Sequence, residues 1–116
     1  MEGKLELTHT DYPGLRVIHV AASRIDSAAA IQFKDQMRAL TDDLTYRAVL
    51  DLSAVSFIDS SGLGAIVASL KQMPSGIRLD LASLQEDVAR VLRLTRMDKV
   101  FIIHDALDLA VAPNGH

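Results

Sequence analysis

The sequence predicts a single α/β domain, in which helices pack on a mixed β-sheet in the order ββαβαβαβα. Three observations lead to this fold class. Short apolar stretches, typical of strands, alternate with longer segments whose apolar residues recur every three to four positions, typical of helices. A turn signal joins the first two strand-like stretches, whereas helical segments separate the later ones, so the sheet is expected to be mixed. The length of 116 residues supports one core and not two.

A hairpin is expected at the N-terminus. Residues 5–7 alternate between apolar and polar side chains and predict an edge strand that ends near Thr10. Residues 15–20 predict the second strand. The turn between them is favoured at residues 11–14, because the proline there fixes φ and the glycine tolerates positive φ.

A helix and a buried strand are expected next. Either Asp26 or Ser27 is suited to be the N-cap of this helix. Its apolar face consists of residues at helical spacing: Ala30, Phe33, Met37, Leu40 and Leu44. Residues 48–52 are almost wholly apolar, which predicts an interior strand.

The next helix is expected from about residue 61 to 73. Residues 74–76 end it, because proline cannot continue a helix and glycine accepts the exit geometry. Residues 77–81 then alternate strictly between apolar and polar side chains. This alternation predicts a strand with one face in solvent.

The C-terminal part predicts a helix, a strand and a short helix. Ser83 and Glu86 have the spacing of a capping box, so Ser83 is expected to cap the first of these. Residues 100–103 predict the last strand. Asp105 is suited to cap a short helix through Val111.

Composition excludes several classes of function. The chain has no cysteine, which excludes disulfides, thiolate catalysis and cysteine metal sites. A net charge of −3 gives no broad basic field, so no nucleic-acid partner is expected. No apolar run approaches the roughly 18 residues of a membrane span, and the N-terminus does not read as a signal peptide. A cytoplasmic domain of residues 1–112 is therefore expected, with residues 113–116 as a flexible tail.

Residues 57–64 are the most informative segment, because they lie between the buried strand and a helix. The segment presents two hydroxyls between a carboxylate and two glycines: Asp59, Ser60, Ser61, Gly62 and Gly64. Backbone N–H groups at a helix start lack partners, and the helix dipole favours an anion there. The arrangement is suited to present a serine.

Two interpretations of Ser60 are open. It is either the helix N-cap, which is worth about 1 kcal/mol over alanine, or a site presented to a partner. Gly62 and Gly64 favour the second, because each costs roughly 0.5–1 kcal/mol relative to alanine within a helix. Their missing side chains either let another backbone approach closely or leave room for a partner. Ser61 is expected to support the turn, with a second acceptor role as the alternative.

Residues 59–64, preceded by residues 50–53 and 55–58, resemble the signature of bacterial anti-sigma factor antagonists, the small STAS domains. The order of elements agrees along nearly the whole chain. The resemblance implies that Ser60 is phosphorylated by a partner serine kinase that doubles as the anti-sigma factor. It also implies a phosphatase that resets Ser60. Unphosphorylated, the chain would bind the kinase and so release the sigma factor.

A second landmark of the family falls on Asp26. Family members often read Gly-acidic-apolar-Asp at this point, and this chain departs from that pattern with the basic Arg24. Asp26 is then either a helix cap or a contact to the kinase, and Arg24 either a solvated side chain or a hydrogen-bond donor to the phosphate. The partner-binding residues implied are Arg24, Asp26, Asp59, Ser61, Gly62, Leu63 and Gly64.

Two rival functions are weighed against this one. STAS-like domains also serve as subunits or regulators of membrane transport complexes, where binding is constitutive. A small hydrolase using Ser60 is disfavoured, because a nucleophile elbow needs glycine at position 58, which is isoleucine. The four histidines have no metal-ligand spacing, and no cofactor fingerprint is present. We expect no catalytic residue, metal or cofactor: the chain is not an enzyme.

Overall fold

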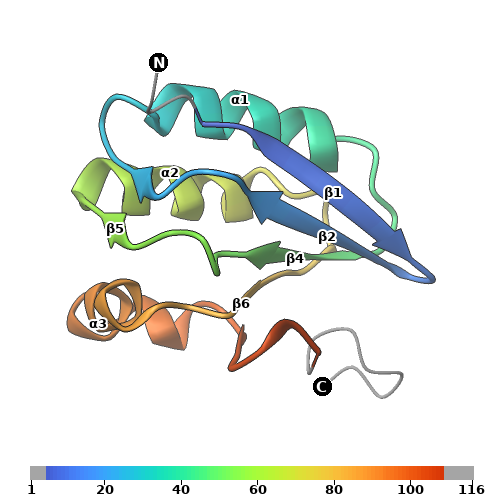
Figure 1. Ribbon diagram of the computed structural model, residues 1–116. Helices are drawn as coiled ribbons and strands as arrows, with labels where there is room; N and C mark the ends of the chain where they lie inside the picture. The colour runs from blue at the N-terminus through green and yellow to red at the C-terminus, as the bar shows by residue number, and fades with distance from the viewer. Residues whose placement is uncertain (1–4, 109–116) are drawn as a thin grey trace.

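Five strands form the main sheet of the protein, whose computed structural model describes residues 5–108 (Figure 1). Their order across the sheet is β1-β2-β4-β6-β7. They are β1 (Leu7–Tyr12), β2 (Leu15–Val20), β4 (Arg47–Asp51), β6 (Leu79–Ala82) and β7 (Ile103–His104). β1 and β2 pair antiparallel as a hairpin, and the other pairs are parallel. The predicted α/β fold with a mixed sheet is confirmed.

Two short strands form a separate parallel pair that the sequence did not predict. β3 (Arg24–Ile25) pairs with β5 (Phe57–Ile58), with Arg24 opposite Phe57. A strand of two residues is too short to carry a recognisable periodicity. The pair is nevertheless important for the site, because it holds the loop after β2 beside the segment that leads into the second helix.

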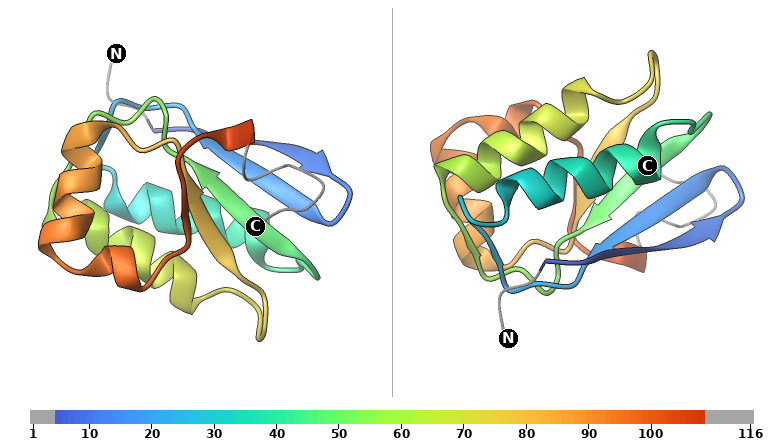
Figure 2. Two further views of the ribbon diagram at one scale, coloured as in Figure 1. Left: turned by 90° about the horizontal axis from the view of Figure 1, so that it is seen from below. Right: turned by 90° about the horizontal axis from the view of Figure 1, so that it is seen from above.

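Helices α1 (Ala30–Thr41) and α2 (Ser60–Lys71) lie side by side on one face of the sheet (Figure 2). α3 (Glu86–Leu94) and the short 3-10 helix η1 (Met97–Lys99) follow β6. The core is continuous between the helices and the sheet. Its largest fully buried side chains include Ile18, Phe33, Met37, Leu50, Ile66, Leu81 and Leu92.

The strand predicted to have one solvated face is buried throughout. All four residues of β6 are buried, and Asp80 has no exposed surface. Its carboxylate accepts hydrogen bonds from Arg78 at 2.8 Å, from Arg47 at 3.2 Å and from the His104 ring at 2.9 Å. The prediction was wrong because polar neighbours from three segments replace the solvent around this carboxylate.

Two predicted helix caps are also wrong. α1 begins only at Ala30, and its N-cap position, Ala29, makes no side-chain cap bond. The Asp26 carboxylate instead accepts the N–H of Ala28 at 3.1 Å, within a turn that precedes the helix. α3 has Gln85 at its N-cap, since Ser83 adopts a left-handed φ of 62° that takes it out of the cap position.

Several element boundaries differ from the predicted ones. α1 ends at Thr41, so Leu44, which was expected on its apolar face, is buried in the loop that follows the helix. β1 extends to Tyr12, so Pro13 and Gly14 alone form the hairpin turn. Residues 100–102, expected as strand, precede the short β7 instead. The helix expected from Asp105 ends outside the described residues, and so does the expected boundary between domain and tail.

Candidate functional site

The start of α2 is capped by Asp59 and not by Ser60. Asp59 is extended, with φ −104° and ψ −175°, and its Oδ1 accepts the N–H of Gly62 at 2.8 Å. Ser60 is therefore the first residue of the helix. Its side chain is exposed, and among the described residues the hydroxyl has no hydrogen-bond partner. Of the two interpretations of Ser60, the N-cap is wrong.

The same aspartate also joins two loops. Its second oxygen, Oδ2, accepts the N–H of Ser27 at 3.2 Å, and its own N–H donates to the Ile25 carbonyl at 3.4 Å. The Asp59 side chain therefore bonds both the start of α2 and the turn after β3. Because both oxygens are engaged, the carboxylate is held in one orientation beside Ser60.

The two glycines of the segment have different roles. A Cβ on Gly62 would lie 1.8 Å from the Ile25 carbonyl oxygen, so a side chain here would clash with the backbone of β3. A Cβ on Gly64 would meet nothing within 4 Å. Both explanations offered by the sequence thus apply, one to each glycine: Gly62 permits close backbone packing, and Gly64 leaves open space.

Arg24 lies in β3 and Asp26 follows directly after it, next to the start of α2. The Arg24 guanidinium carbon is 4.2 Å from the centre of the Phe57 ring, a cation–π geometry. Its Nε donates to Asp26 Oδ2 at a long 3.3 Å, and the arginine side chain is 57% exposed. Arg24 is therefore held by two weak contacts. Phe57 was not singled out from the sequence, because its role depends on the register of two very short strands.

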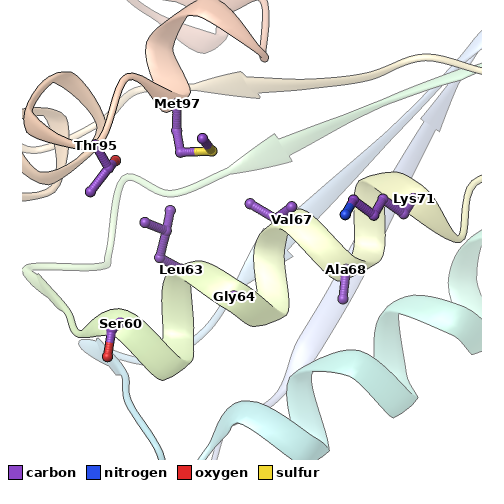
Figure 3. A pocket seen from close by; sticks show the side chains of 8 residues that line it. All are labelled: Ser60, Leu63, Gly64, Val67, Ala68, Lys71, Thr95 and Met97. Carbon is purple, nitrogen blue, oxygen red and sulfur yellow. The ribbon is translucent and has the colours of Figure 1, made fainter.

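A groove runs along α2 from Ser60 at one end to Lys71 at the other (Figure 3). Its volume is about 400 Å³, and its opposite wall comes from the segment that follows α3. The lining residues are Ser60, Leu63, Gly64, Val67, Ala68, Lys71, Thr95 and Met97. The α2 residues recur at i, i+3, i+4, i+7, i+8 and i+11, so they share one helical face, and this spacing is visible in the sequence. The contribution of Thr95 and Met97 was not readable, since they lie more than 20 residues further along the chain.

One ionisable group with a perturbed pKa lies at the end of the strand before the site. Burial acts to raise the pKa of Asp51, but hydrogen bonds from the His19 ring and from Ser53 outweigh it, and the pKa lies below its ordinary value. The His19 Nδ1 is 2.8 Å from the carboxylate, and the Ser53 N–H donates to it at 3.0 Å.

Within residues 5–108, no three histidine or carboxylate side chains gather where they could hold a metal ion. No helix in the same range is long and apolar enough to cross a bilayer. What this range does offer is an exposed serine hydroxyl, a fixed carboxylate and an apolar groove, close together at the start of α2.

The chain belongs to the STAS domain family, whose model matches residues 6–110. RsfB, an anti-sigma-F factor antagonist of Mycobacterium tuberculosis, is 26% identical over 107 residues, covering 89% of this chain and 87% of the relative. The crystal structure of an anti-sigma factor antagonist from Mycobacterium paratuberculosis superposes with a TM-score of 0.84 at 26% identity, covering 96% of each chain. A putative anti-sigma factor antagonist from Thermotoga maritima gives 0.76 at 30% identity, covering 90% of each.

These comparisons confirm the family resemblance seen in the sequence. The relatives are anti-sigma factor antagonists, which are regulatory STAS proteins and not enzymes, and on that ground the chain is not an enzyme. The roles of individual residues around Ser60 remain predictions.

Proposed function

We propose that this chain is a phosphorylation-controlled anti-sigma factor antagonist of the cytoplasm. Unphosphorylated, it binds a serine-kinase anti-sigma factor and releases the sigma factor; phosphorylated at Ser60, it dissociates until a phosphatase resets it. The observation that carries the proposal is the free Ser60 hydroxyl. Because Asp59 caps the helix, Ser60 is exposed and, within the described residues, makes no hydrogen bond of its own.

The partner-binding surface extends over two loops. The β3–β5 pair and the Asp59 bond to the Ser27 N–H support a shared surface, since they hold the Arg24–Asp26 loop beside the start of α2. A kinase that reaches the Ser60 hydroxyl meets both loops at once. The residues assigned to this surface are Arg24, Asp26, Asp59, Ser61, Gly62, Leu63 and Gly64.

Phosphate at Ser60 is expected to preserve the fold and to weaken the complex. It adds about −1.5 to −2 charges at pH 7, which the N-terminus of a helix tolerates or stabilises. In a closed interface the same charge would be desolvated beside the Asp59 carboxylate, which is costly. A difference of about 2.7 kcal/mol between the two forms changes the affinity roughly a hundredfold.

The first experiment is a pull-down from the native cytoplasm that compares wild type with Ser60→Asp. Ser75→Asp is the matched control, because Ser75 is exposed in the loop after α2 and away from the groove. We expect wild type and the control to capture a serine kinase of the anti-sigma type, and Ser60→Asp to lose it.

The opposite result would favour the rival function, that of a subunit or regulator of a membrane transport complex. If all three forms capture the same transport complex, binding is constitutive and does not depend on charge at Ser60. If Ser60→Asp unfolds, the comparison is repeated with Ser60→Ala against wild type, following phosphate incorporation by the captured kinase. Incorporation into Ser60→Ala equal to that into wild type would remove Ser60 as the acceptor.

A further inference from the structure

The groove along α2 is larger than phosphorylation of Ser60 requires. Ser60 lies at one end, and α2 continues from there to Lys71, about 17 Å along the helix axis. Gly64 has no side chain and Ala68 only a methyl group, so another chain can approach the backbone of α2 at these positions. Leu63 and Val67 point from α2 toward Met97 on the facing segment, and all three side chains are apolar (Figure 3).

The groove is open along its length. None of its lining residues is buried, and Ser60, Gly64, Lys71 and Thr95 are exposed. Small-molecule sites usually enclose most of the ligand surface, which this groove cannot do. An open apolar groove about three helical turns long is instead suited to an amphipathic helix, whose apolar face lies in the groove while its polar face stays in water.

The charged residues around the groove indicate which charge a bound partner should carry. Lys71 lines the groove, and two further cations, Arg96 and Lys99, lie within two residues of Met97 in the chain, as does one anion, Asp98. Within residues 5–108, none of the three cations has an ion-pair partner. This local positive charge contrasts with the net charge of −3 for the whole chain. Complementary charge across an interface selects and steers the partner.

We infer that the groove binds an acidic amphipathic helix of the anti-sigma partner, with aliphatic side chains beside Gly64 and a carboxylate at Lys71. The identity of the partner rests on the proposed function; the chemistry of the occupant does not. With an acidic helix in the groove, phosphorylation of Ser60 lowers the affinity of the complex directly. A doubly charged group at Ser60 would stand at the end of the apolar groove and repel an acidic helix.

The probe is a fluorescent, stapled helical peptide of about 12 residues, matched to the length of α2. It carries leucines at i, i+3, i+4 and i+7 and glutamates elsewhere, and a second peptide carries lysines in place of the glutamates. We expect saturable binding of the acidic peptide to the full chain, with methyl NMR shifts at Leu63, Val67 and Met97. We expect little binding of the basic peptide.

Two variants test the groove itself. Gly64→Leu fills it without a clash at Cβ, since nothing lies within 4 Å there, and should weaken the acidic peptide about tenfold or more. Lys71→Glu should weaken it several-fold and improve the basic peptide. Ala39→Leu and Arg38→Glu are the matched controls, because both residues are exposed on α1 and away from the groove. Circular dichroism verifies that each variant is folded.

The outcomes separate this inference from the proposed function. Absence of acidic-peptide binding, equal binding of both peptides, or insensitivity to Gly64→Leu would overturn the groove assignment. Self-association in sedimentation that Gly64→Leu abolishes would assign the groove to a second copy of the chain, and would overturn it too. If the acidic peptide binds as expected while no kinase is captured in the pull-down, the groove assignment stands and the proposed function fails.

Discussion

Replacing Gly62 by alanine should destabilise the domain, although alanine is the better helix former. The new Cβ would lie 1.8 Å from the Ile25 carbonyl oxygen and 2.7 Å from its carbon, whereas real Cβ contacts are essentially never under 3.0 Å. These neighbours are backbone atoms, so no side chain can rotate away. α2 and β3 must separate, which strains the bonds from the Asp59 N–H to Ile25 and from the Ser27 N–H to Asp59.

The magnitude follows from two opposing effects. Overpacking of a well-packed site costs about 1–3 kcal/mol, and each of the two strained hydrogen bonds is worth about 1 kcal/mol. The higher helix propensity of alanine offsets only about 1 kcal/mol of this cost. We therefore expect Gly62→Ala to lower the free energy of unfolding by about 2–4 kcal/mol, which for a domain of this size lowers Tm by roughly 10–15 °C.

Gly64→Ala is the matched control, because its Cβ meets nothing within 4 Å. This variant should be as stable as wild type or more stable by up to about 1 kcal/mol. Urea unfolding followed by circular dichroism measures both variants. Equal stability of Gly62→Ala and Gly64→Ala would refute the close packing of α2 on β3 as the reason for a glycine at position 62.

Three further predictions concern the groups around the site. Asp59→Ala should cost about 1–2 kcal/mol in urea unfolding, because the cap of α2 and the bond to the Ser27 N–H are lost together; a cost near zero would contradict the capping role. Arg24→Ala should speed dephosphorylation of Ser60 if the guanidinium leaves its weak contacts with Asp26 and Phe57 for the phosphate, and unchanged kinetics would leave Arg24 a solvated side chain. The pKa of Asp51 is lowered on folding, so its ionised form contributes stability that is fully present above its ordinary value of 3.8 and is lost as pH falls through the lowered pKa. Asp51→Asn should therefore lose less stability than wild type as pH falls from about 5 through the lowered pKa, and parallel pH profiles would argue against this linkage.

Much of the fold was readable from the sequence, because its elements have strong local signals. The predicted limits of β2 agree with the structure, and those of β4 and α2 differ by one or two residues at each end. These segments combine a clear apolar periodicity with turn residues at their ends. The helix caps failed where side chains had alternatives, since Asp26 bonds the N–H of Ala28 within a turn and Ser83 adopts a left-handed conformation.

The candidate site was readable in part. Residues 59–64 were recognisable as a presented serine, because two glycines and two hydroxyls at a helix start are unusual for a plain helix. Which residue caps the helix was not readable, since Asp59 and Ser60 are both favoured caps and only the extended backbone of Asp59 decides between them. The contacts that Arg24 makes could not be predicted from the sequence either, because they depend on the pairing of β3 with β5.

The sequence by itself determined the α/β class, the family and the position of the presented serine, because each follows from residues close together in the chain. Only the tertiary structure decided that Gly62 is required by the Ile25 carbonyl while Gly64 opens a groove, and that Met97 completes the groove. It also decided that Asp80, in a strand that alternates like a surface strand, is fully buried among two arginines and a histidine. These features depend on contacts between residues distant in the chain, and local propensity and periodicity carry no information about such contacts.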